Sequence, residues 1–367
     1  MRRLLVLPAV CLTIACWGNY GPLMHRGQHG MGGNGLRPFI CVGFAYFVVA
    51  VLVPVILLRM RGESGRWTLA GTAWSLAAGL VGALGAFGAI LAFAFGGRPV
   101  YVMPLIFGGA PVVNTLVTMA LSRSFRDAGL VFYAGVLLVA LGGAGVLSFK
   151  PQKPTRAHHE PPPARGAEAH EGAHEGTADI GHSDAGNAEA PTTEATDGSQ
   201  PWRIAAAVCV AALSWGSYGP VLHNGQMRMA GSRLRPFLCV GVAYFLTAVA
   251  APWMLLTAMG DSGGIGAWMP DGRIDGILWS LAGGSAGAIG ALGVILAFNA
   301  GGKPLLVMPL IFGGAPVMNT ATTILAEGTG RWIGPPFLAS LGLVIAGAVT
   351  VLVFAPRPRH VPTKPIA

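Results

Sequence analysis

The stretch VMPLIFGGAPV occurs twice in this chain, at 102–112 and again at 307–317, without a single difference. It is apolar enough to lie in a lipid bilayer, yet each copy carries two prolines and a Gly-Gly pair, which weaken helices. The repetition indicates that the chain is built from two related parts, and that both parts need the same unusual segment.

The identity extends well beyond this stretch. Residues 74–115 and 279–320 agree at 30 of 42 positions, with an offset of 205. Two further motifs recur 198 positions apart: WGNYGPLMHRGQ (17–28) as WGSYGPVLHNGQ (215–226), and LRPFICVGFAYF (36–47) as LRPFLCVGVAYF (234–245). The seven extra residues fall in the loop 257–275, where an insertion costs little conformational entropy. The chain is therefore a duplication.

Composition indicates which class of protein carries this duplication. Of 367 residues, 53% are hydrophobic and 11% are charged, whereas a soluble domain usually has about 25% charged residues. Nine of the 15 acidic residues lie between Glu160 and Asp197. The uncharged runs elsewhere approach the roughly 20 apolar residues that cross a bilayer. We therefore expect a polytopic membrane protein. Its net charge of +9 is better explained by basic loops than by nucleic-acid binding.

Each half holds five predicted transmembrane helices. They lie near 4–24, 37–58, 68–96, 99–121 and 128–149 in the first half, and near 204–222, 236–258, 276–300, 303–325 and 333–356 in the second. Because five is odd, the second half must enter the membrane from the opposite side. The predicted fold is therefore all-α, with a five-plus-five inverted-topology repeat. The start of the chain resembles a signal peptide, but its recurrence at 204–215 favours a first helix that is retained.

The predicted organisation has four parts: a first repeat at 1–149, a linker at 150–202, a second repeat at 203–358 and a tail at 359–367. The linker is rich in Ala, Gly, Glu, Pro, Thr and His and has almost no large apolar residue, which predicts disorder. Its histidines leave loose metal binding open as an alternative to a soluble tether. No metal site is predicted in the spans, because they contain no Asp or Glu away from their ends.

Basic residues near the first two spans favour one orientation. They are Arg2, Arg3, Arg59, Arg61 and Arg66. By the positive-inside rule, they place both termini in the cytoplasm. We expect a multi-pass protein of the cell (inner) membrane, and the sequence leaves open whether it forms a homodimer.

The quoted stretch falls near the middle of the fourth predicted span of each half. A proline removes one helical hydrogen bond and presses against the carbonyl four residues before it, so we expect a kinked or unwound helix at the membrane midplane. Paired interruptions of this kind point to a transporter's binding site. The predicted breaks are Pro104, Gly108, Gly109 and Pro111, and Pro309, Gly313, Gly314 and Pro316.

Polar and aromatic residues near the breaks are candidates for binding a solute. An Asn-Thr pair follows each break, and Asn offers both donors and an acceptor. Alternatively, these Asn side chains only cap helix ends or bond to a neighbouring helix. The candidate binding residues are Asn114, Thr115, Asn319, Thr320, Asn299, Trp17, Tyr20, Trp215 and Tyr218. The candidate gate residues, which are alternatively ordinary helix-end groups, are His25, Arg37, His223 and Arg235.

The architecture resembles the drug/metabolite transporter superfamily, the ten-helix carriers with EamA-like repeats. The first-span motifs CWGNYG and SWGSYG look like that family. So do AFAFGGRPVYVMPL (92–105) and AFNAGGKPLLVMPL (297–310). The resemblance implies cytoplasmic termini and a solute cavity between the halves, but it implies no substrate and no direction.

Together these features predict a secondary transporter that moves a small polar metabolite by alternating access. We expect neither catalytic residues nor a cofactor, because no span carries a Ser/His/Asp set, a zinc motif or a carboxylate pair. A multi-pass receptor or scaffold and a membrane-embedded enzyme are the alternatives. Coupling is left open between none, sodium held by free carbonyls, and protons carried by His25 and His223. The first two are favoured, because these histidines lie at the predicted mouths.

Overall fold

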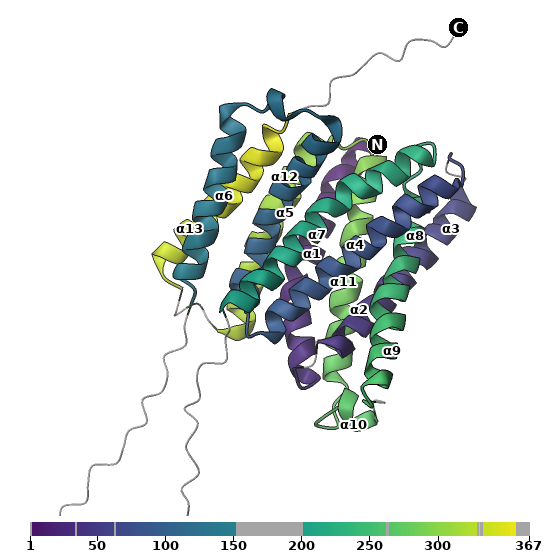
Figure 1. The fold of residues 1–367 in the computed structure, drawn as a ribbon, viewed down its shortest axis with the longest axis vertical. Coiled ribbons are helices and arrows are strands. Elements are labelled where there is room, and N and C mark those ends of the chain that lie inside the picture. Colours follow the sequence, from purple (N-terminus) through teal and green to yellow (C-terminus); the bar gives the residue numbers. More distant parts are fainter. Residues whose placement is uncertain are drawn as a thin grey trace, which may run out of the picture. The chain divides into compact units, whose positions relative to one another are not determined.

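A computed structural model of the protein describes residues 2–33, 35–61, 64–151, 201–261, 264–328, 330 and 333–356. Every regular element within these ranges is helical (Figure 1). Among the described residues, ten helical segments are long and apolar enough to cross a membrane, so the chain is a multi-pass integral membrane protein. Almost all of the predicted linker, and the predicted tail, lie outside the described residues.

The helices follow the predicted spans in order. The first half consists of α1 (Val6–Gly30), α2 (Leu36–Phe47), a π-helical segment (Val48–Leu52), α3 (Val53–Arg61), α4 (Leu69–Ala94), α5 (Pro99–Ser122) and α6 (Leu130–Ser148). The second consists of α7 (Pro201–Arg228), α8 (Leu234–Tyr244), a π-helical segment (Phe245–Ala250), α9 (Ala251–Ala258), α10 (Ile265–Trp268), α11 (Asp275–Asn299), α12 (Pro304–Glu327) and α13 (Pro335–Val353). The short helix α10 lies in the loop that carries the seven-residue insertion.

The first span of each half is longer than predicted. Both α1 and α7 continue six residues past their expected ends, so His25 and His223 lie within helices rather than at helix exits. The extra turns of α1 pack closely on α11, because a Cβ at Gly27 would overlap Ser280. Tertiary packing therefore continues the helix beyond a Gly-Pro pair that would weaken an isolated one.

The prolines of the quoted stretch do not unwind their helices. Helix α5 is uninterrupted through Pro104, Gly108, Gly109 and Pro111, and α12 through Pro309, Gly313, Gly314 and Pro316. Of the two predicted forms, a kinked or an unwound helix, the unwound form is therefore absent from α5 and α12. The small residues instead let neighbouring helices approach, since a Cβ at Gly108 would overlap Val344 of α13. Close packing of this kind holds a helix together even where proline removes a hydrogen bond.

The regular α-helix is interrupted in the second span of each half instead. The π-helical segments Val48–Leu52 and Phe245–Ala250 occupy matching positions in the two repeats. Each is followed closely by a proline, Pro54 or Pro252. A π-helical turn is wider than an α-helical one, which gives room to the ring of a proline that would otherwise press on the preceding turn.

The two halves pack against each other reciprocally. Helix α1 packs on α11 and α12, and its counterpart α7 packs on α4 and α5; likewise α2 packs on α11, and α8 on α4. Two tryptophans follow the same rule, since the ring of Trp17 lies against Gly290 and that of Trp215 against Gly85, where a Cβ would overlap it. The first span of each half thus packs against the third and fourth spans of the other half.

Candidate functional site

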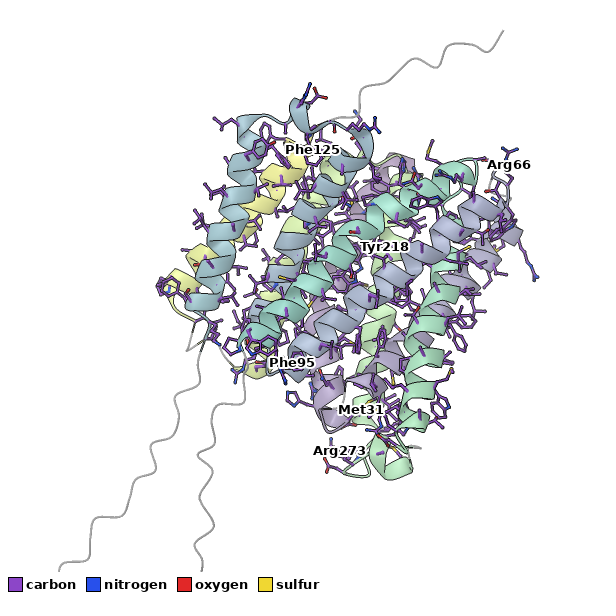
Figure 2. All side chains as sticks on the ribbon, viewed as in Figure 1. Met31, Arg66, Phe95, Phe125, Tyr218 and Arg273 are labelled. Carbon is purple, nitrogen blue, oxygen red and sulfur yellow. The ribbon has the colours of Figure 1, made fainter. Side chains whose placement is uncertain are left out.

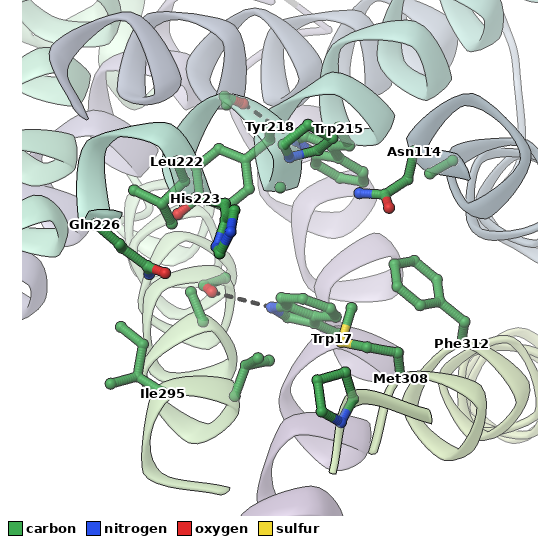
Figure 3. Close-up of a pocket in the computed structure, with 18 of the residues that line it drawn as sticks. Trp17, Asn114, Trp215, Tyr218, Leu222, His223, Gln226, Ile295, Met308 and Phe312 are labelled. Atoms are coloured by element: carbon green, nitrogen blue, oxygen red, sulfur yellow. Dashed lines mark hydrogen bonds between the residues drawn. The ribbon is translucent and has the colours of Figure 1, made fainter. Parts of the chain in front are cut away.

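Residues of both halves line a cavity of about 590 Å³ (Figure 3). This volume is within the roughly 300–1,000 Å³ of typical small-molecule sites. Helices α1, α2, α4 and α5 contribute from the first half, and α7, α8, α11 and α12 from the second. The reciprocal packing of the halves therefore places the cavity between them.

Four rings at repeat-related positions form a continuous series along the cavity wall. The ring centroid of Trp17 is 6.1 Å from that of Phe312, Phe312 is 6.3 Å from Phe107, and Phe107 is 6.3 Å from Trp215. We call these four residues the aromatic belt. Tyr20 extends the belt, with its ring centroid 5.8 Å from that of Trp215 and the two ring planes inclined by 71°.

Backbone hydrogen bonds fix the two tryptophans of the belt. Nε1 of Trp17 donates to the carbonyl of Gly287 at 3.1 Å, and Nε1 of Trp215 donates to the carbonyl of Gly82 at 3.1 Å (Figure 3). Each indole therefore uses its single polar group within the protein. What the indoles offer to the cavity is mainly their apolar ring surface.

A pair of tyrosines lies where α2 meets α8. Tyr46 and Tyr244 are repeat counterparts, and their rings stack with centroids 3.8 Å apart and planes inclined by 6°. Both are buried and both line the cavity. Because a residue here stacks on its own counterpart, the pair lies at the boundary between the halves.

The two asparagines of the repeated Asn-Thr pairs lie in different surroundings. Asn114 is partly exposed and lines the cavity, and its side chain points between Trp215 and Phe312 (Figure 3). Asn319 is 0% exposed and does not line the cavity; its Nδ2 donates to the carbonyl of Pro99 at 2.7 Å. The structure therefore brings only one of the two to the cavity.

Of the other predicted binding residues, four line the cavity and three, Thr115, Thr320 and Asn299, do not. Trp17, Tyr20, Trp215 and Tyr218 line the cavity. Thr115 and Thr320 are buried and do not, and the hydroxyl of Thr115 donates to the carbonyl of Pro111 in its own helix at 2.9 Å. Asn299 lies at the exposed end of α11, where its Oδ1 accepts a hydrogen bond from Nη1 of Arg233 at 2.7 Å.

The two histidines proposed as gates are also in different surroundings. His223 is exposed and lines the cavity. His25 does not line it: its Nδ1 is 3.7 Å from Oε1 of Glu327, and its ring lies against Phe93. The position that corresponds to Glu327 in the first half is Ser122, which carries no charge to pair with His223.

The two arginines proposed as gates do not line the cavity. Nη2 of the buried Arg37 contacts both carboxylate oxygens of Asp261, at 2.7 and 2.6 Å. Nη1 of Arg235 donates to Oγ of Ser232 at 3.3 Å. Each arginine thus lies at the start of a helix, α2 or α8, and forms a hydrogen bond to a residue outside that helix.

Repeat counterparts differ in exposure between the two ends of the cavity. We call the end with Ser122, His223, Gln226, Arg233 and Pro304 the open end, because these residues line the cavity. We call the end with their counterparts, among them Pro99, Gln28, His25 and Glu327, the closed end. Met103 near the closed end is 0% exposed, whereas its counterpart Met308 lines the cavity. The same sequence is thus packed shut at one end and accessible at the other.

Several lining residues were missed by sequence reasoning. They are chiefly Phe107, Phe312, Tyr46, Tyr244 and Met308. Their repetition is a signal that could identify them, because each aromatic residue recurs at its counterpart position. Phe107 and Phe312 lie in the two copies of the quoted stretch. An apolar ring in an apolar span, however, looks the same whether it faces lipid or a cavity.

The chemistry of the lining is limited. Arg233 and His223 are its basic members, both at the open end, and the described lining includes no Asp, Glu, Lys or Cys. No known protein family matches the chain, and neither does any curated protein. A functional proposal therefore rests on the fold and on this cavity.

Proposed function

We propose that this chain is a secondary transporter with two five-helix halves in inverted topology, as in the drug/metabolite transporter superfamily. Successive connections support alternate crossings: Met31 and Phe95 lie at one end of the bundle, and Arg66 and Phe125 at the other (Figure 2). Arg66 and Arg273 follow the second span of their respective halves, and they lie at opposite ends. That placement is what an inverted repeat requires.

The observation that carries the proposal is the asymmetry of the cavity. Its two ends are built from repeated sequence, yet one is open and the other is closed by buried contacts such as the bond from Asn319 to Pro99. Because the two ends share most of their sequence, we infer a second state in which the exposures are exchanged. Alternation between two such states moves a solute from one side to the other.

We propose that both termini lie in the cytoplasm and that the cell (inner) membrane holds the protein. The chain begins at the end of the bundle that carries Arg66 and Phe125 (Figures 1 and 2). The open end lies on the same side, because Ser122, which lines the cavity, is close in sequence to Phe125. The state described here would then face the cytoplasm.

A matched pair of cysteine substitutions tests the proposal. In a variant without the five native cysteines, Met103→Cys and Met308→Cys place one thiol near each end of the cavity. Reconstituted in vesicles, Met308→Cys should react with a charged thiol reagent supplied from one side, and Met103→Cys only with reagent from the other. A transported solute should raise the slower rate and lower the faster one.

Uptake into the same vesicles completes the test, with an imposed sodium gradient, an imposed pH gradient, or neither. Uptake without a gradient would identify facilitated diffusion. Labelling of both thiols from the same side, or no change in labelling under any solute that enters, would contradict alternating access.

A further inference from the structure

We propose that the solute is an uncharged ring compound that stacks on the aromatic belt and forms hydrogen bonds at its rim. Pyranose sugars and nucleosides share this chemistry. The inference deepens the proposed function, on which it rests for why the compound is moved. Binding in the cavity can nevertheless be measured without transport, so the two can fail separately.

The belt is built as a rigid stacking surface. The indole N–H groups of Trp17 and Trp215 are already used by backbone carbonyls, and each ring lies in a space that a glycine on the facing helix leaves free. The rings therefore need little reordering when a ligand arrives, which favours binding. A flat or apolar ring face is the ligand surface that stacks on such rings.

Polar groups beside the belt suit the rim of such a ring. The amide of Asn114 offers two donors and an acceptor at the cavity wall,. Tyr20 lines the cavity while 4% exposed, and its buried hydroxyl has no hydrogen-bond partner among the described residues. A buried hydroxyl is normally hydrogen-bonded. A hydroxyl or carbonyl group of the ligand would supply the missing hydrogen-bond partner of Tyr20.

The charges around the cavity argue against an ionic solute. A buried cation is stabilised by a paired anion or by aromatic faces, and no carboxylate occurs in the described lining. Only the faces of the belt would therefore stabilise a cation, and tetraethylammonium serves below as the direct test. The guanidinium of Arg233 at the open end would also repel a cation on its way in. An anion would be attracted to that end, but at the belt it would meet aromatic faces, which carry negative potential.

Binding to the purified full-length chain in detergent tests the inference directly. Equilibrium dialysis would use D-glucose, D-galactose, uridine and adenosine as uncharged rings, with tetraethylammonium and benzoate as charged comparisons. We expect saturable binding of at least one uncharged ring and none of either ion. Preference for the hexoses identifies a pyranose site, and preference for the nucleosides identifies a base site.

Matched variants locate the binding. Trp17→Leu and Trp215→Leu remove a ring face, whereas Trp17→Phe and Trp215→Phe keep a smaller ring face and lose the N–H bond. We expect the dissociation constant to rise about tenfold or more in the Leu variants, and about threefold or less in the Phe variants. Trp253→Leu is the control, because Trp253 is exposed on α9 and does not line the cavity.

The outcomes separate cleanly. Equal weakening in the Leu and Phe variants would mean that the tryptophans act only as structural anchors, which overturns the inference. Binding of tetraethylammonium or benzoate in preference to every uncharged ring overturns it too, as does failure of all four rings to bind. Saturable ring binding without uptake in vesicles would leave the inference standing and remove the proposed transport.

Discussion

The closed and open ends of the cavity are made of nearly the same amino acids. At the closed end, Asn319 is buried and bonded to the carbonyl of Pro99. At the open end, Asn114 follows the same repeated stretch and faces the cavity, while Pro304, the counterpart of Pro99, is exposed. These counterpart positions carry the same residues, so their different surroundings do not come from the residues themselves. Under the proposed function, each end would be closed in one state and open in the other.

The strongest way to break this comparison is to substitute the two asparagines one at a time. Asn319→Leu removes a buried hydrogen bond and leaves the carbonyl of Pro99 without that donor, which costs about 1–3 kcal/mol. Asn114→Leu removes an amide that faces the cavity, so stability in this state should change by less than about 0.5 kcal/mol. If the proposed alternation uses each asparagine in turn, uptake should fall roughly fivefold or more in both variants.

Thermal unfolding in detergent and vesicle uptake provide the two measurements. A lower apparent Tm in Asn319→Leu than in Asn114→Leu, with uptake impaired in both, is the expected pattern. If the two variants lost the same stability, the ends would not differ in solution as they do here.

A glycine pair sharpens the comparison with a smaller change. A Cβ at Gly21 would overlap the enclosed side chain of Met103 and lie 2.8 Å from Oδ1 of Asn319. At the counterpart Gly219, a Cβ would lie 2.6 Å from Nδ2 of Asn114, whose amide can turn into the cavity. Gly21→Ala should therefore destabilise by about 1–2 kcal/mol through overpacking, and Gly219→Ala by less than about 0.5 kcal/mol.

The same unfolding assay decides this prediction, and cysteine labelling adds a second readout. Gly21→Ala should also raise the labelling of Met103→Cys, because it loosens the closed end. A larger loss of stability in Gly219→Ala than in Gly21→Ala would contradict the assignment of the two ends.

The smallest expected effect concerns Asp261, which pairs with the buried Arg37. The Asp261 side chain is 36% exposed, so solvent screens the pair and Asp261→Asn should cost no more than about 1 kcal/mol. The difference should shrink in 1 M salt, where the Debye length falls to about 3 Å. Asp271→Asn, at an exposed position, is the control. An equal loss of stability in the two variants would mean that the Arg37–Asp261 pair does not stabilise the fold.

The number and order of the spans could be predicted from the sequence, because long uncharged runs have few stable alternatives to membrane-crossing helices. Several residues of the cavity could be predicted as well. Trp17 and Trp215 were found because a polar-tipped aromatic repeated within a span is conspicuous. Phe107 and Phe312 were not, since a phenyl ring gives no sign of whether it faces lipid, protein or a cavity.

Two features were beyond the reach of local patterns. The continuity of α5 through Pro104 and Pro111 depends on close neighbours such as Val344 of α13, and proline rules that consider one helix alone omit that packing,. The different roles of Asn114 and Asn319 cannot be read from segments that are almost identical. They depend on how the surrounding helices pack, which buries Asn319 and leaves Asn114 at the cavity.

The placement of Trp17 against Gly290, and of Trp215 against Gly85, has a consequence for inheritance. Each half of the gene encodes the glycine against which the tryptophan of the other half packs. A side chain added at Gly85 would overlap Trp215, which is encoded far away in the other half of the gene. The duplicated segments are therefore bound to evolve as partners, and neither five-helix half should be expected to fold when it is synthesised without the other.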